Sequence, residues 1–122
     1  MTPQTDWIIV FYIEDNGRSP AAEFVFSLDD KAQDKILLAI ERLRVLNVTA
    51  REPLVKHLHG KLYELRVESR ANAYRLLYFF FVGRQIVVLH GFQKKTQKTP
   101  RGEIEVAQRR MKRHIEREGR DT

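Results

Sequence analysis

Apolar residues recur along the chain with two different periods, and these periods predict its elements. Between Asp30 and Leu46 they lie three or four positions apart, which places them on one face of a helix. Trp7–Ile13 is instead a continuous β-branched and aromatic run without a breaker, which predicts a strand. The helical stripe consists of Ala32, Ile36, Ala39, Ile40, Leu43 and Leu46. Because this stripe must be buried, we expect the helix to pack against a sheet or another helix.

A short helix is predicted between these two elements. The segment Glu14–Arg18 has the composition of a turn and ends the first strand. Ser19 suits an N-cap and Pro20 suits the first helical position, so a helix should begin there and end near Leu28.

Three further strands and a last helix complete the chain. The strands are predicted at Leu62–Glu68, Ala73–Val82 and Gln85–Phe92, and their short links make them antiparallel neighbours. Thr99 and Pro100 predict the start of the last helix, with Thr99 as its cap. The apolar stripe of that helix is Ile104, Ala107, Met111 and Ile115.

This order, β-α-α-β-β-β-α, predicts an α+β fold in which a small antiparallel sheet of about four strands packs against helices. The 122 residues fit one domain spanning 1–122, because no repeat, linker or low-complexity tract divides them. We expect residues 119–122 to form a frayed tail.

The composition narrows the class of protein. Residues are 43% hydrophobic and 31% charged, which is typical of a folded globular chain and not of a disordered one. The absence of cysteine excludes disulfides, thiolate zinc sites and cysteine nucleophiles. The N-terminal run lacks the basic start of a signal peptide, and no apolar run is long enough to span a bilayer. We therefore expect a cytoplasmic protein without a membrane partner.

The charge is positive and unevenly distributed. Lysine and arginine number 22 against 16 acidic residues, and ten of these cations lie between Lys94 and Arg120 against four glutamates. Such an excess attracts a polyanion such as RNA, or an acidic protein partner. The alternative is a solvated helix with spare cations.

Two arginines lie in the middle of predicted strands, where apolar residues are less costly. Arg66 shares a strand face with Glu64, and Arg75 shares one with Leu77. One interpretation is an ion pair with Glu64 on a wet sheet face. The other is a cationic cleft for a phosphate chain, which requires Arg66 and Arg75 on the same side of the sheet and not both locked into carboxylate pairs.

The segment that leaves the last strand is also basic. Lys94, Lys95 and Lys98 precede a helix N-terminus, which is a favourable place for an anion. Phe92 could stack on a base or belong to the core. His90 could transfer a proton near neutral pH or simply be packed and hydrogen-bonded.

Metal chemistry is poorly matched by this sequence. His57 and His59 are close together, but they lie in a predicted loop without a carboxylate cluster. His114 lies alone on the last helix, and the hydrolase, phosphate-loop and zinc-protease motifs are missing. We expect no metal and no cofactor.

Four segments carry a specific pattern in order along nearly the whole chain. They are Glu14–Pro20 with Glu23 and Phe24, Lys56–Arg66 (K-x-L-x-G-x-L-Y-E-L-R), Tyr74–Tyr78, and His90–Pro100 followed by Glu103, Ile104 and Ala107. Together they resemble the phage-derived HigB-type toxins of the RelE/ParE superfamily.

That resemblance implies a compact RelE/ParE-like antiparallel sheet packed against helices. It implies a toxin of a type II toxin–antitoxin pair that cleaves mRNA, usually in the ribosomal A site and without a metal. The 2′-hydroxyl attacks the adjacent phosphate and leaves a 2′,3′-cyclic phosphate and a 5′-hydroxyl. The expected partner is a cognate helix-turn-helix antitoxin that also represses the operon.

The resemblance also implies roles for individual residues. Arg75 matches the strand arginine at the scissile phosphate, Arg66 a basic position of the preceding strand, and Lys94 or Lys95 the cation that supports the leaving group. RelE has a basic residue where this chain has Glu64, and a C-terminal tyrosine base that this chain lacks. Glu64 and His90 are the remaining candidate bases. The expected RNA-binding residues are Lys56, Phe92, Lys98 and Arg101.

These roles lead to one mutational expectation and leave two other functions open. Arg75→Ala should abolish growth arrest without unfolding the protein. The alternatives are a ParE-like toxin that inhibits gyrase and a non-catalytic module that binds nucleic acid or an antitoxin. Discrete 5′ ends on mRNA would distinguish a nuclease from both.

Overall fold

The apolar stripe of the long helix forms the element that its spacing predicts. In the computed structural model, which describes residues 6–119, α2 runs over Asp30–Leu46 and buries every stripe residue except Leu46. The side chain of Asp29 caps this helix by accepting a hydrogen bond from the backbone N–H of Ala32 at 2.9 Å. Leu46 is 37% exposed, and the chain continues directly into a short 3-10 turn, η2, over Asn47–Thr49.

The shorter helix α1 covers Pro20–Phe26 and ends slightly before the predicted Leu28. Ser19 occupies the N-cap position, but its hydroxyl donates to the backbone carbonyl of Tyr12 at 2.8 Å and not to the helix. Ser19 therefore fixes the approach of the chain from the first strand.

The sheet has five strands, not the predicted four. Four of them match predicted segments and are β1 (Ile8–Phe11), β3 (Leu62–Ser69), β4 (Asn72–Phe81) and β5 (Gln85–Lys94). The additional strand is β2 (Val55–His59), which pairs antiparallel with β3 along the edge of the sheet. Its polar sequence resembles a loop because an edge strand buries little on either face.

The sheet is also mixed, not antiparallel throughout. Its order is β1-β5-β4-β3-β2, and β1 runs parallel to β5 while all other neighbours are antiparallel. The prediction was wrong here because β1 and β5 are far apart in sequence, and no short link reveals their pairing. The observed order is β-α-α-β-β-β-β-α.

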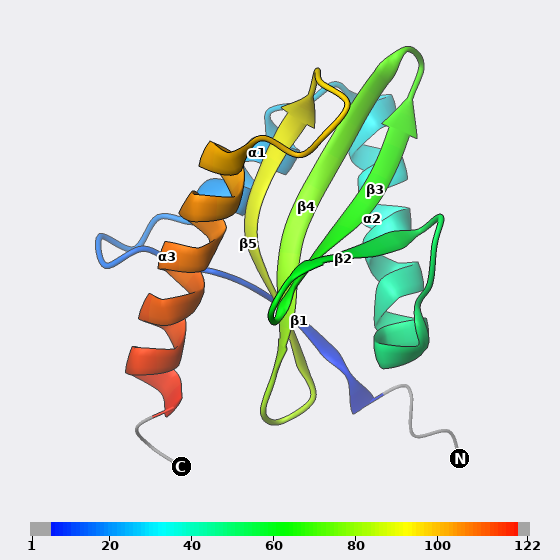
Figure 1. The fold of residues 1–122 in the computed structure, drawn as a ribbon. Coiled ribbons are helices and arrows are strands. Elements are labelled where there is room, and N and C mark those ends of the chain that lie inside the picture. Colours follow the sequence, from blue (N-terminus) through cyan, green and yellow to red (C-terminus); the bar gives the residue numbers. More distant parts are fainter. Residues whose placement is uncertain (1–5, 120–122) are drawn as a thin grey trace.

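Helices cover both faces of the sheet (Figure 1). One face packs against α1 and α2 through side chains such as Leu65, Leu76 and Tyr78. The other face packs against α3 (Arg101–Glu118) through Leu77, Phe79 and Ala107, among others. We call the second of these the α3 face of the sheet.

The last helix begins without the predicted cap. Pro100 occupies its N-cap position and no side chain caps it, because the hydroxyl of Thr99 is directed elsewhere. The helix ends at Glu118 with Gly119 as its C-cap, and the remaining residues of the predicted frayed tail, 120–122, lie outside the described residues.

Gly91 of β5 lies where α1 approaches the sheet most closely. A Cβ atom there would be 2.6 Å from Cδ2 of Phe24 and 2.8 Å from Cδ2 of Leu76. We expect Gly91→Ala to lower the free energy of unfolding by about 1–3 kcal/mol, because a packed ring must move. Urea denaturation measures the loss. Gly102→Ala is the control, since no atom lies within 4 Å of its added Cβ, and equal stability of the two variants would contradict the expectation.

Candidate functional site

The register of the central strands brings the two predicted arginines together. Arg66 of β3 lies opposite Arg75 of β4, which in turn lies opposite Phe92 of β5. Residues directly opposite each other point to the same side of a sheet. Both arginines therefore lie on the α3 face, as a shared phosphate cleft requires.

A buried carboxylate lies between the two guanidinium groups. One oxygen of Glu64 is 3.7 Å from Nε of Arg66 and 3.8 Å from Nε of Arg75. Its other oxygen accepts a hydrogen bond from the Thr99 hydroxyl at 2.7 Å. Glu64 is only 2% exposed. One carboxylate cannot neutralise two guanidinium groups, so these three side chains together carry a net positive charge, which the exposed Glu52 offsets in part from 3.8 Å away from Arg66.

The two arginines differ in their access to solvent. Arg75 is 3% exposed, and its Nη1 donates to the carbonyl of Tyr74 at 2.9 Å. Burial lowers the pKa of the Arg75 guanidinium, while the nearby Glu64 carboxylate partly offsets that effect. The side chain of Arg66 is 30% exposed. A ligand on this face can therefore contact Arg66. Arg75 is buried below the surface, next to Glu64.

A pocket of about 270 Å³ opens over this cluster. Its walls come from β2, β3, the loop after β5 and the start of α3. Four cationic side chains line it, against Glu64 as its single carboxylate, and these cations are Lys56, Arg66, Lys94 and Lys98. Such an excess of cations around one concave site favours an anionic ligand.

Individual contacts set the positions of these lysines. Lys56 on β2 is exposed and lies opposite Glu64 in the ladder. Nζ of Lys94 donates to the carbonyl of Gln97, which folds the loop back over the pocket. Lys98 is exposed at the rim, next to the Thr99 that contacts Glu64. The loop is thus attached to the cluster at its base while its ammonium groups remain near the opening.

Three other predicted residues lie outside this pocket. Lys95 is exposed directly after β5, and Arg101 is exposed with its Nε 3.4 Å from Glu105. Phe92 is only 7% exposed and packs in the core of the α3 face. The placement of Phe92 matches the core interpretation, because a nucleic acid base cannot reach a buried ring.

His90 is held by two charged neighbours and does not line the pocket. Its Nε2 is 2.6 Å from a Glu103 oxygen, and Nη1 of Arg110 is 3.2 Å from its Nδ1. Arginine can only donate, so Nδ1 accepts and Nε2 carries the proton that is donated to Glu103. Burial lowers the pKa of His90, although Glu103 acts in the opposite direction. The neutral imidazole is therefore favoured, with both nitrogens already engaged.

Much of the positive charge of α3 is neutralised within the molecule. Arg110 is 3.3 Å from Glu14, and Arg113 and Arg117 each lie 3.1 Å from Asp15. The hydrogen bond from Arg113 is the main reason that the pKa of Asp15 is lowered. Arg109 and Lys112 remain exposed on the helix, while Lys56, Arg66, Lys94 and Lys98 gather in the pocket over the sheet.

The described part of the chain supports neither a metal site nor a membrane-spanning helix. Residues 6–119 contain no group of three His, Cys, Asp or Glu side chains placed to hold a metal ion. His57 instead contacts the carbonyl of Gly60 through Nε2 at 2.7 Å. No helix within the same residues is long and apolar enough to cross a membrane.

Sequence reasoning missed the contribution of Thr99 and Gln97 to this site. Thr99 before Pro100 has the local pattern of a helix cap, and that pattern does not reveal a partner 35 positions away. Gln97 contributes a backbone carbonyl, which its side-chain identity cannot indicate. The basic character of the surrounding segment was the available signal.

Two comparisons with known proteins agree with each other. Residues 23–112 match the family model described as phage derived protein Gp49-like (DUF891). The chain is also 34% identical over 97 residues to a protein of Mycobacterium tuberculosis named probable endoribonuclease HigB1. That match covers 80% of this chain and 75% of the relative, with the same values in strains CDC 1551 and H37Rv.

Proposed function

This chain belongs to the phage-derived Gp49-like family of HigB-type toxins, and we propose that it is the RNA-cleaving toxin of a type II toxin–antitoxin pair. The similarity to a protein named as an endoribonuclease supports the activity, and it extends over most of both chains. We propose further that residues 1–122 form a single toxin domain of RelE/ParE type.

The observation that carries the proposal is the cationic pocket on the α3 face. Four cations surround one carboxylate there, and the two arginines of β3 and β4 face the same side. RNA cleavage through the 2′-hydroxyl builds negative charge on the non-bridging oxygens of the phosphate. A preorganised cluster of cations stabilises that charge more in the transition state than in the ground state.

The pocket suggests a division of roles. Arg66 contacts the non-bridging oxygens, and Lys94 donates to the leaving 5′-oxygen as the bond from phosphorus to that oxygen breaks. Lys56 and Lys98 bind the flanking backbone. Of the two candidate bases, only Glu64 lines the pocket, so we assign to it the proton of the attacking 2′-hydroxyl. Arg75 is a positioning residue that acts through Glu64, because it is buried beneath it.

Similarity to the family supports the remaining parts of the proposal. We propose that the substrate is mRNA bound to the ribosome, that the partner is a helix-turn-helix antitoxin, and that the compartment is the cytoplasm. Charge stabilisation by side chains suffices for this chemistry, so we propose cleavage without a metal ion. Lys95 and Arg101 do not contact the substrate in this proposal and only add to the positive potential that attracts RNA.

Product analysis tests this function directly. Incubation of the purified chain with mRNA and ribosomes should give discrete 5′ ends by primer extension, with 5′-hydroxyl and 2′,3′-cyclic phosphate termini. Addition of EDTA to ribosome-free reactions on RNA should leave any cleavage unchanged. Gyrase inhibition without RNA ends would indicate a ParE-like toxin, and RNA binding that never leads to cleavage would indicate a non-catalytic module.

A further inference from the structure

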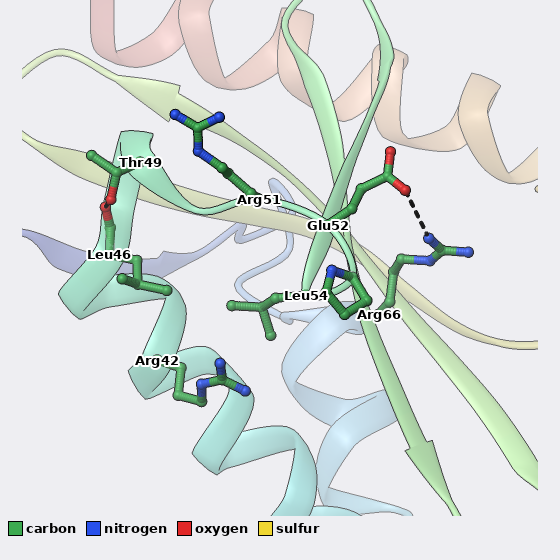
Figure 2. A pocket seen from close by; sticks show the side chains of 8 residues that line it. Arg42, Leu46, Thr49, Arg51, Glu52, Leu54 and Arg66 are labelled. Atoms are coloured by element: carbon green, nitrogen blue, oxygen red, sulfur yellow. Dashed lines mark hydrogen bonds and ion pairs between the residues drawn. The ribbon is translucent and has the colours of Figure 1, made fainter.

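A second basic pocket lies on the other side of Arg66. It has a volume of about 390 Å³ and is formed by the end of α2, by η2 with the segment after it, and by Arg66 in the middle of β3 (Figure 2). Arg42 of α2, Arg51 of the connecting segment and Arg66 of β3 line it, with Glu52 as its single carboxylate. Three cations from three separate elements thus meet at one concavity.

Two of these arginines are available for a ligand. Arg42 and Arg51 are exposed, and within residues 6–119 neither guanidinium has a hydrogen bond or an ion pair. Glu52 reaches only Arg66, at 3.8 Å, and its side chain is 67% exposed. An exposed ion pair at this distance is weak. The pocket therefore keeps unpaired positive charge.

The arrangement of the three guanidinium groups favours a chain of phosphates over one isolated phosphate. In Figure 2, Arg51 extends away from Arg42, and Arg66 lies on the opposite side of Leu54. Groups that point apart in this way around one concavity are better placed to contact successive phosphates of a strand than a single anion. Leu46, Pro53 and Leu54 add an apolar surface between them, against which bases or riboses can pack.

Arg66 connects this pocket to the proposed active site, because it lines both. Leu54 lines the second pocket and Lys56, two positions along the chain, lines the first. We propose that the second pocket binds the backbone of the single-stranded RNA that continues from the scissile phosphate, without reading its sequence. This inference rests on the proposed function and extends its substrate to several nucleotides.

Binding of RNA of two lengths tests the inference. The probes are a dodecamer and a dinucleotide of 2′-O-methyl RNA, which lacks the attacking hydroxyl. For Arg42→Gln/Arg51→Gln we expect roughly tenfold weaker binding of the dodecamer at moderate salt, and a salt slope smaller by about 1.4, since each lost cation removes about 0.7. The dinucleotide is too short to span both pockets and should bind unchanged. Fluorescence anisotropy and competition measure these affinities.

The matched control is Lys31→Gln/Lys35→Gln. It removes the same charge from two exposed positions of α2, the helix that carries Arg42, at the end remote from both pockets. The inference is overturned if the two double variants bind the dodecamer equally, or if the dinucleotide loses as much affinity as the dodecamer. It is also overturned if Arg42→Gln/Arg51→Gln binds RNA normally but fails to bind the antitoxin, because the pocket then docks a protein.

The same proteins separate this inference from the nuclease proposal. A wild-type chain that cuts no RNA but shows the length-dependent loss would retain the second pocket as an RNA site and remove the nuclease function. Cleavage by the wild type, together with undiminished dodecamer binding by Arg42→Gln/Arg51→Gln, would retain the nuclease function and remove the second pocket as an RNA site.

Discussion

Replacement of Arg66 by alanine is expected to slow RNA cleavage by about 10²- to 10³-fold, which is the usual cost of one lost contact to transition-state charge. Within residues 6–119, Arg66 is the one guanidinium that lines the proposed active site, and its ion pairs to Glu64 and Glu52 are long, at 3.7 and 3.8 Å. Its removal takes one of two cations from the buried Glu64 carboxylate but leaves Arg75 in place, so we expect the fold to remain intact with a smaller loss of unfolding free energy than for replacement of the buried Arg75. Single-turnover cleavage at saturating RNA measures the rate.

Two further variants make the Arg66 result specific. Arg66→Lys keeps the charge but loses the planar fork, so it should fall between the wild type and alanine. Lys112→Ala removes an exposed cation of α3, on a helix that contributes no cation to the pocket, and should cleave normally. Thermal melts of all three establish that they fold. A folded Arg66→Ala that cleaves as fast as the wild type would exclude Arg66 from the chemistry.

Elements whose signal is local could be predicted from the sequence. The helix at Asp30–Leu46 matches its prediction because one stripe and the capping Asp29 lie within a single segment. The strands β3, β4 and β5 follow from apolar runs and short links. The parallel pairing of β1 with β5 and the polar edge strand β2 could not be predicted, because both depend on contacts between distant segments.

In the candidate site, too, features with a local signal could be predicted from the sequence, and features that depend on distant segments could not. Alternation assigned each arginine to a face of its own strand but left open whether Arg66 and Arg75 share one side of the sheet, and the observed register, which pairs them directly, shows that they do. The burial of Arg75 was not predictable from its own strand, because its neighbour Glu64 is in turn held by Thr99 of the loop after β5, 35 positions further along the chain. The number of cations in the last helix likewise overestimated its available positive charge. Glu14 and Asp15, which are distant in sequence, neutralise several of its arginines.

The burial of Arg75 changes what its replacement should do. From the sequence, Arg75→Ala was expected to remove activity without unfolding the chain, whereas a guanidinium that is 3% exposed and adjacent to a buried carboxylate cannot be removed without a structural cost. We expect Arg75→Met, which replaces much of the volume but not the charge, to lower the free energy of unfolding by about 3–5 kcal/mol, because it leaves Glu64 with less compensation. Chemical denaturation followed by circular dichroism measures this loss.

A second substitution identifies the buried charge as the cause. In Glu64→Gln/Arg75→Met the carboxylate is also removed, while the amide can still accept the hydrogen bond from Thr99. We expect this double variant to recover more than half of the lost stability, since replacing both partners of a buried pair is far less costly than removing one. It should remain inactive if Glu64 takes up the 2′-hydroxyl proton. A double variant no more stable than Arg75→Met would show that packing, and not the uncompensated carboxylate, is what Arg75 supplies to this fold.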